Sequence, residues 1–161
     1  KGIDVLVDAF KQMPDKKIKV VGTGVLDEKI KNRVRNEQLN NVELMGFKTR
    51  KEVNQIVKGA KALIMCSQWY ETFGMVIVEA YSNGVPTIVG NIGNIKDLVL
   101  EGKTGELFQY DSSESLVEAV ARFEKKYDQS YAQNGYRLYK EKFSPDANYK
   151  ILRNIYQNVI V

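Results

Sequence analysis

The sequence predicts an α/β fold in which a parallel sheet carries helices on both faces and is followed by C-terminal helices. Three observations predict it. Short apolar strands alternate with helical segments of about ten residues, glycine turns follow several strands, and the end of the chain shows only helical periodicity. Strands and helices that alternate in this way are typical of βαβ units, in which ligands bind at the carboxyl ends of the strands.

Each element is located by its apolar spacing and its end signals. A helix is expected over residues 5–13, with Asp4 as its N-cap and Pro14 beyond its end. A strand over residues 17–21 then stops at Gly22-Thr23-Gly24. Further strands are expected over residues 42–45, 62–66, 86–89 and 105–108, and further helices over residues 27–36, 50–58, 73–83 and 94–100. We therefore expect a Rossmann-like domain.

The end of the chain is expected to be entirely helical. One helix, capped by Asp111 or Ser112, should reach Lys126. A second should begin at Ser130, and a third should begin at Ser144-Pro145 and reach about Asn158. Serine at the N-cap with proline at the first helical position is a strong start signal. The third helix has an apolar stripe, which we expect to pack against another surface. Its members are Tyr149, Leu152, Ile155, Tyr156 and Val159.

Composition excludes several classes of function. The 161 residues, 43% of them hydrophobic, suit one globular domain, and the net charge of +4 suits a small anionic ligand but not a nucleic-acid surface. The chain has no histidine, which excludes histidine-based acid–base catalysis and histidine metal ligands. The single Cys66 cannot form a disulfide within the chain, and we expect it to be buried in a protein of a reducing compartment.

The sequence also indicates a location and a place in a longer protein. No apolar run approaches the ~20 residues of a membrane span, and no signal peptide is recognised, so a cytoplasmic location is expected. The chain starts Lys1-Gly2-Ile3-Asp4, without an initiator methionine and directly in a helical pattern. We therefore expect residues 1–161 to be a single domain taken from a longer chain.

Two carboxylates stand eight residues apart after the apolar strand at 62–66. Glu71 precedes a helix start, whereas Glu79 lies inside a helix that is apolar on nearly every side and is expected to be buried. A buried carboxylate needs donors or a counter-charge, which a structural Lys or Arg or the hydroxyl groups of a ligand could supply. The free N–H groups at this helix start would add an anion site, with Gly74 allowing close approach; they are those of Thr72, Phe73, Gly74 and Met75.

These residues resemble a known family. The segment from Glu71 to Glu79 is similar to the Glu-x7-Glu motif of retaining glycosyltransferases with the GT-B architecture. Other elements of the resemblance follow in the family's order, over roughly residues 1 to 125. They are Lys1-Gly2, Gly22-Thr23-Gly24, the strand ending at Gly46-Phe47, Asn83-Gly84-Val85-Pro86 and Gly102-Lys103-Thr104-Gly105. The resemblance implies the nucleotide-sugar-binding, C-terminal half of a two-domain enzyme whose N-terminal acceptor domain lies outside this sequence.

The resemblance also implies a role for each site residue. Glu71 is the expected catalytic residue and meets the transferred sugar, while Glu79 binds the ribose hydroxyls. The remaining donor-binding residues are Lys1 at the pyrophosphate, Gly22 and Gly24 near the donor, Met45 and Phe47 beside the base, and the backbone of Thr72, Phe73, Gly74, Met75 and Val76 at the sugar and phosphates. For three residues an alternative remains: Lys1 could be a solvated terminal residue, Phe47 could belong to the core, and Trp69-Tyr70 could pack on the sugar or fill the core.

The implied reaction is transfer from a nucleoside diphosphate sugar, most simply a UDP-sugar, with retention at the anomeric carbon. No cofactor and no metal are expected, and nucleic acid is not an expected partner. The acceptor would be a glycan or a lipid-linked sugar in the synthesis of cell-surface polysaccharide or glycolipid, bound through the N-terminal domain, and the longer protein could associate with a membrane surface. This chain alone is expected to be inactive.

Two other classes of function remain as alternatives. A dinucleotide-binding oxidoreductase would also place Gly22-Thr23-Gly24 after a strand, but Asp27 stands where the third glycine of that fingerprint belongs. A non-catalytic binding or scaffold domain would use both glutamates in structural ion pairs. Binding of UDP rather than NAD separates the three.

Overall fold

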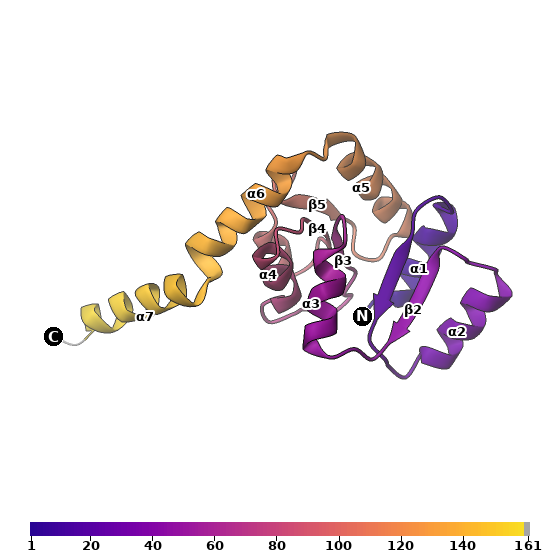
Figure 1. Ribbon diagram of the computed structural model, residues 1–161, viewed down its shortest axis with the longest axis horizontal. Coiled ribbons are helices and arrows are strands. Elements are labelled where there is room, and N and C mark those ends of the chain that lie inside the picture. The colour runs from indigo at the N-terminus through magenta and orange to yellow at the C-terminus, as the bar shows by residue number, and fades with distance from the viewer. Residues whose placement is uncertain (160–161) are drawn as a thin grey trace.

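The computed structural model describes residues 1–159 and confirms the α/β class (Figure 1). The strands are β1 (Ile18–Val21), β2 (Val42–Gly46), β3 (Leu63–Met65), β4 (Thr87–Gly90) and β5 (Gly105–Phe108). The α-helices are α1 (Ile3–Gln12), α2 (Asp27–Asn36), α3 (Arg50–Lys58), α4 (Met75–Ser82), α5 (Ser113–Lys126), α6 (Gln129–Leu138) and α7 (Pro145–Val159). A 3₁₀ turn, η1 (Ile95–Leu98), follows β4, and a π-helical turn, η2 (Tyr139–Phe143), joins α6 to α7.

All strand pairs are parallel, but their hydrogen bonds form two ladders instead of one. β1 pairs with β2, and β3, β4 and β5 pair in that order. The two ladders still share a hydrophobic core, to which Val20, Val42, Ile64 and Ile88 contribute. The parallel pairing of the strands is therefore as predicted, whereas the division of the strands into two hydrogen-bonded ladders was not predicted.

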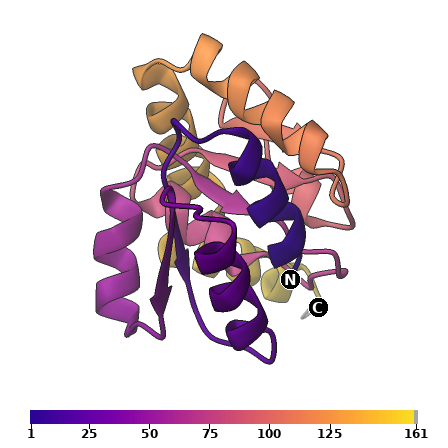
Figure 2. The same ribbon diagram turned by 90° about the vertical axis from the view of Figure 1, so that its right-hand side faces the viewer.

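Helices cover both faces of the β3–β4–β5 ladder. Neighbouring side chains of a strand point to opposite faces, so Ile88 of β4 enters one core and Val89 enters the other. α1 and α5 pack side by side over the first face, as Figure 2 shows. On the second face, Ile77 and Tyr81 of α4 pack with Ile95 of η1.

The β1–β2 ladder is covered differently. On its inner face Ile18 packs into the core shared with α1 and α2. On the other face Lys19 and Glu43 lie opposite each other, 4.0 Å apart and both exposed. Lys19 alternates with the apolar Ile18 and Val20, so β1 has one apolar and one charged face. The charged face therefore remains open to solvent.

The start of α1 and the helix expected after β4 differ from the predictions. The N-cap of α1 is Gly2, not Asp4, and its φ of 74° lies in the left-handed region that favours glycine. A Cβ on Gly2 would stand 1.8 Å from the carbonyl oxygen of Cys66, so glycine is also needed for the close approach of the two backbones. The predicted helix over residues 94–100 is only the 3₁₀ turn η1.

The C-terminal helices leave the body of the molecule step by step. α5 packs on α1, and α6 packs on α4, whereas α7 contacts η2 and extends outward (Figure 1). Within residues 1–159 the apolar stripe of α7 is exposed at Tyr149, Ile155 and Val159, so its packing against another surface stays a prediction. No helix within residues 1–159 has the length and apolar character of a membrane span.

Candidate functional site

The predicted site residues lie on the segments that follow the strands. Since parallel strands end at the same edge, Gly22 after β1 and Phe47 after β2 lie together, and the Gly22 N–H donates to the Gly46 carbonyl at 2.9 Å. The segment from Cys66 to Gly74 follows β3 in the second ladder. Within residues 1–159, these two groups of site residues make no hydrogen bond or ion pair with each other.

Glu71 is held by two groups at the end of β3. Its Oε1 accepts a hydrogen bond of 2.9 Å from Ser67 Oγ and forms an ion pair with the Lys1 ammonium. The Lys1 ammonium, and next the Ser67 hydroxyl, keep the pKa of the Glu71 carboxyl below its ordinary value. Lys1 is placed there by Gly2, whose backbone lies against Cys66. The site therefore holds Glu71 ionised and fixed.

The start of α4 supplies unpaired backbone donors beside Glu71. Within the described residues, the N–H groups of residues 72–76 donate no hydrogen bond to protein, while the Ile77 N–H donates to the Gly74 carbonyl at 2.9 Å. Free N–H groups and the helix dipole favour an anion at such a terminus. Thr72 is exposed. The ring of Phe73 lies edge-on against the ring of Phe143, with 5.9 Å between the ring centroids.

Gly74 serves this helix start for a different reason than predicted. It was expected to let a ligand approach, but it is buried, and a Cβ there would meet Ile95 at 3.0 Å and Leu98 at 3.3 Å. Its φ of 78° also lies in the left-handed region. Glycine is therefore required by the packing of the helix start on η1.

Glu79 lies on the open face of α4, which corrects the prediction that it is buried. Its side chain is 43% exposed, and Met75 and Val76, one turn earlier, are also exposed. Residues at i and i+4 share a helix face, so these three form one accessible surface while Ile77 and Tyr81 face the core. An exposed carboxylate does not need a structural counter-charge, which weakens the scaffold alternative.

The charged neighbour of Glu79 is Arg50, at the first position of α3. The guanidinium Nη2 lies 3.6 Å from Glu79 Oε1, across a hollow of about 490 Å³ between α3 and α4, called here the α3–α4 hollow. Sequence reasoning missed both Arg50 and Ser67. Ser67 could have been found from its place directly after a strand and four residues before Glu71, whereas nothing in the sequence pairs Arg50 with Glu79.

The glycine loop after β1 does not form a dinucleotide cradle. The Gly24 N–H donates to Asp27 Oδ1 at 2.7 Å, so a carboxylate occupies the start of α2, where a pyrophosphate would bind. A Cβ on Gly22 or Gly24 would meet no atom within 4 Å, which leaves the loop open to an external group. Nearby, Met45 is half-buried in β2 and Phe47 is 75% exposed, so Phe47 is not a core residue.

Exposed aromatic side chains precede Glu71. Trp69 is 72% exposed and Tyr70 is 82% exposed, which excludes the alternative that they fill the core. The ring of Tyr70 lies over Gly93, where an added Cβ would come within 2.8 Å. The loop after β4 therefore supports the loop after β3, while the Trp69 and Tyr70 side chains remain largely accessible to solvent.

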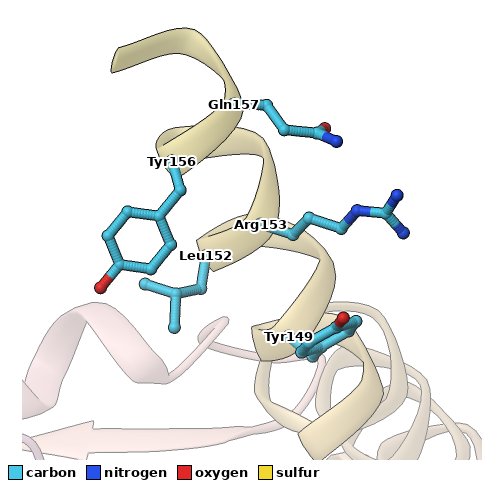
Figure 3. Close-up of a pocket in the computed structure, with 5 residues that line it drawn as sticks. All are labelled: Tyr149, Leu152, Arg153, Tyr156 and Gln157. Atoms are coloured by element: carbon cyan, nitrogen blue, oxygen red, sulfur yellow. The ribbon is translucent and has the colours of Figure 1, made fainter. Parts of the chain in front are cut away.

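Two further features bear on ligand binding. A second hollow is lined by α7 alone, and Figure 3 shows Leu152 and Tyr156 on one side of that helix with Arg153 and Gln157 on the other. A hollow along a single protruding helix encloses no ligand. Within residues 1–159 no group of three or more Asp, Glu or Cys side chains could hold a metal ion.

Together these residues form an anion site flanked by two carboxylates of different character. Glu71 is fixed by Lys1 and Ser67 before the helix start, and Glu79 lies about one turn inside the helix with a half-exposed side chain. The fold and this arrangement define the chain as a Rossmann-like domain of the kind found in glycosyltransferases with the GT-B architecture.

Comparison with known proteins gives the family. The Glycosyl transferases group 1 family matches residues 1–140, and the chain belongs to that family. An uncharacterized glycosyltransferase of Methanocaldococcus jannaschii is 30% identical over 161 residues, which are 99% of this chain and 45% of that protein. The Escherichia coli UDP-Gal:alpha-D-GlcNAc-diphosphoundecaprenol alpha-1,3-galactosyltransferase is 28% identical, with 68% of this chain and 28% of that protein covered.

A solved structure shows the same fold. HepE of Anabaena, in a crystal structure with UDP-glucose, superposes with a TM-score of 0.83 at 25% identity, over 98% of this chain and 45% of that one. The chain thus spans less than half the length of each of these relatives.

Proposed function

We propose that this chain is the donor-binding half of a retaining glycosyltransferase and that its donor is a UDP-sugar. The observation that carries the proposal is the start of α4, whose unpaired N–H groups stand between the fixed carboxylate of Glu71 and the open carboxylate of Glu79. A diphosphate suits the N–H groups, and the hydroxyls of a ribose and of a sugar suit the two carboxylates. The UDP and UDP-sugar named for the relatives fit this arrangement.

The chemistry asked of this half is stabilisation of the departing diphosphate. Negative charge develops on the leaving oxygen, and N–H groups that are already oriented lower the barrier without further reorganisation. Lys1 adds positive charge, because an ammonium has three donors and only one is needed for Glu71. Glu71, held by Ser67, is then placed to accept hydroxyl groups of the transferred sugar.

The acceptor and the setting belong to the same proposal. The acceptor is a glycan or a lipid-linked sugar that a second domain binds, in the synthesis of polysaccharide or glycolipid at the cytoplasmic side of a membrane. This chain supplies the donor site and should show no transfer by itself. Polysaccharide synthesis is supported by the names of relatives, such as a colanic acid biosynthesis glycosyltransferase of Salmonella typhimurium.

The nucleotide is tested by calorimetric titration of the chain with UDP, GDP, ADP and NAD. We expect UDP to bind most tightly and NAD not to bind, because Asp27 fills the position that a dinucleotide pyrophosphate would need. Preferential binding of NAD would support the oxidoreductase alternative. Absence of binding for all four ligands would support the scaffold alternative.

No metal is part of the proposed mechanism. The helix start and Lys1 supply the positive potential that a divalent cation would otherwise give. The UDP titration should therefore be the same in EDTA and in excess magnesium chloride. A large loss of affinity in EDTA would overturn this part of the proposal.

A further inference from the structure

The backbone of Arg50 is held in place by hydrogen bonds at the start of α3, although its side chain is exposed. It is the first residue of α3, and Thr49 before it forms a capping box with Glu52. The Thr49 N–H donates to Glu52 Oε2 at 2.8 Å, and the Glu52 N–H donates to Thr49 Oγ1 at 3.4 Å. Both hydrogen bonds join Thr49 and Glu52, which lie on either side of Arg50 in the sequence. The Arg50 backbone is therefore held without a contact from its own side chain.

The two helices that carry Arg50 and Glu79 are also fastened to each other. Asn83 Nδ2 donates to Asn54 Oδ1 at 2.7 Å and to the Glu79 carbonyl at 2.8 Å. This amide bridge joins the last turn of α4 to the middle of α3. The ion pair between Arg50 and Glu79 therefore spans helices that other contacts already hold in register.

The pair has the character of a ligand-facing contact. Arg50 is 92% exposed, and an exposed ion pair adds little to folding stability. Within the described residues, the Glu79 carboxylate accepts no hydrogen bond, and the Arg50 guanidinium Nη2 lies 3.6 Å from its Oε1. A carboxylate has about four acceptor positions, so Glu79, which lines the α3–α4 hollow, can still accept hydrogen bonds there.

We propose that Arg50 is a positioning residue for the nucleotide: it orients the Glu79 carboxylate across the α3–α4 hollow so that vicinal ribose hydroxyls can donate to it. The proposal rests on the proposed function, in which Glu79 receives the ribose. A long glutamate side chain on an open helix face loses rotamer freedom when a ligand binds. The positive charge of Arg50, 3.6 Å away, favours one set of Glu79 rotamers and so reduces that loss before the ligand arrives.

The variants separate this role from a general effect of charge. Arg50→Gln removes the guanidinium, Arg50→Lys keeps a positive charge, and Lys51→Gln removes the neighbouring positive charge that lines the same hollow. Equal melting temperatures establish that all three variants fold like the parent chain. Each is titrated with UDP and with 2′,3′-dideoxy-UDP, which lacks both ribose hydroxyls.

We expect Arg50→Gln to weaken the binding of UDP about two- to fivefold, which is the range for an exposed charge pair. Arg50→Lys should retain most of the parent affinity. Lys51→Gln should bind UDP like the parent chain. The penalty of Arg50→Gln should disappear with dideoxy-UDP, and it should also disappear in a Glu79→Gln background, because Arg50 acts through Glu79.

Several results would overturn the proposal. They are an unchanged UDP affinity in Arg50→Gln, an equal penalty with dideoxy-UDP, or an equal loss in Lys51→Gln. Each of these leaves the proposed function intact, because the parent chain still binds UDP. Failure of the parent chain itself to bind UDP would instead reject the proposed function and the role of Arg50 together.

Discussion

Ser67 Oγ donates a hydrogen bond of 2.9 Å to Glu71 Oε1, the same oxygen that pairs with the Lys1 ammonium. If Glu71 meets the sugar, Ser67 helps to aim it. We expect Ser67→Ala to weaken UDP-glucose by roughly two- to tenfold, the value of one hydrogen bond, and to leave UDP unchanged. Ser82→Ala is the control, because the Ser82 hydroxyl donates to the backbone carbonyl of Glu79, not to a site carboxylate. Calorimetry with both ligands tests this, and equal weakening of UDP by Ser67→Ala would contradict it.

The same contacts predict a pH dependence of stability. Because the pKa of Glu71 is lowered in the folded state, its contribution is present above the ordinary value of 4.5 and is lost as the pH falls through the folded pKa. The free energies of unfolding of the parent chain and of Glu71→Gln, measured in urea, should therefore differ at pH 7 and converge as the pH falls below 4.5 and through the folded pKa. The difference should stay below about 1 kcal/mol, since Lys1 is largely solvated. A difference that grows on acidification would contradict the assignment.

Gly2 should tolerate no side chain. Gly2→Ala adds a Cβ that would overlap the Cys66 carbonyl oxygen at 1.8 Å, in a backbone conformation with φ of 74°. We expect a loss of roughly 2–5 kcal/mol in the free energy of unfolding. Gly84→Ala is the matched control, because its φ is 67° but no atom lies within 4 Å of the added Cβ, so only about 1–2 kcal/mol should be lost. Urea unfolding measures both, and equal losses would show that the close approach is not tight.

Cys66 should react slowly with thiol reagents. Burial raises the pKa of its thiol to about 11, from an ordinary value of 9.0. The rate of modification by iodoacetamide should therefore still rise about tenfold per pH unit between pH 8 and pH 10, because only the thiolate reacts. The modification rate of the same cysteine in the urea-unfolded chain should level off about two pH units lower. A folded-state rate that levels off near pH 9 would contradict the assigned burial.

Local signals predicted several elements to the residue. The bounds of α2, α3 and β5 are those read from the sequence, because acidic first turns, the Thr49 capping box and a glycine before an apolar run mark these ends. The start of α1 could not be predicted, because Gly2 is chosen by the approach of Cys66, 64 residues away. The open face of α4 could not be predicted either, since an apolar helix gives no sign of which side faces solvent.

The site divides in the same way. The spacing of Glu71 and Glu79 around a glycine at a helix start is a feature of the chain itself, and it identified both carboxylates. The groups that hold them come from distant parts of the chain: Lys1 reaches Glu71 from the segment before α1, and Arg50 reaches Glu79 from the start of α3. Contacts between distant segments depend on how the helices pack, which no local pattern records.

The division in which Glu79 binds the nucleotide and Glu71 binds the sugar is tested most directly by titrating Glu79→Gln and Glu71→Gln with UDP and UDP-glucose. Glu79→Gln should weaken both ligands by roughly 1–3 kcal/mol, because both contain the ribose, and should leave the melting temperature almost unchanged. Glu71→Gln should spare UDP and weaken only UDP-glucose. Equal weakening of bare UDP by both substitutions, or a large loss of stability in Glu79→Gln before ligand is added, would contradict this division.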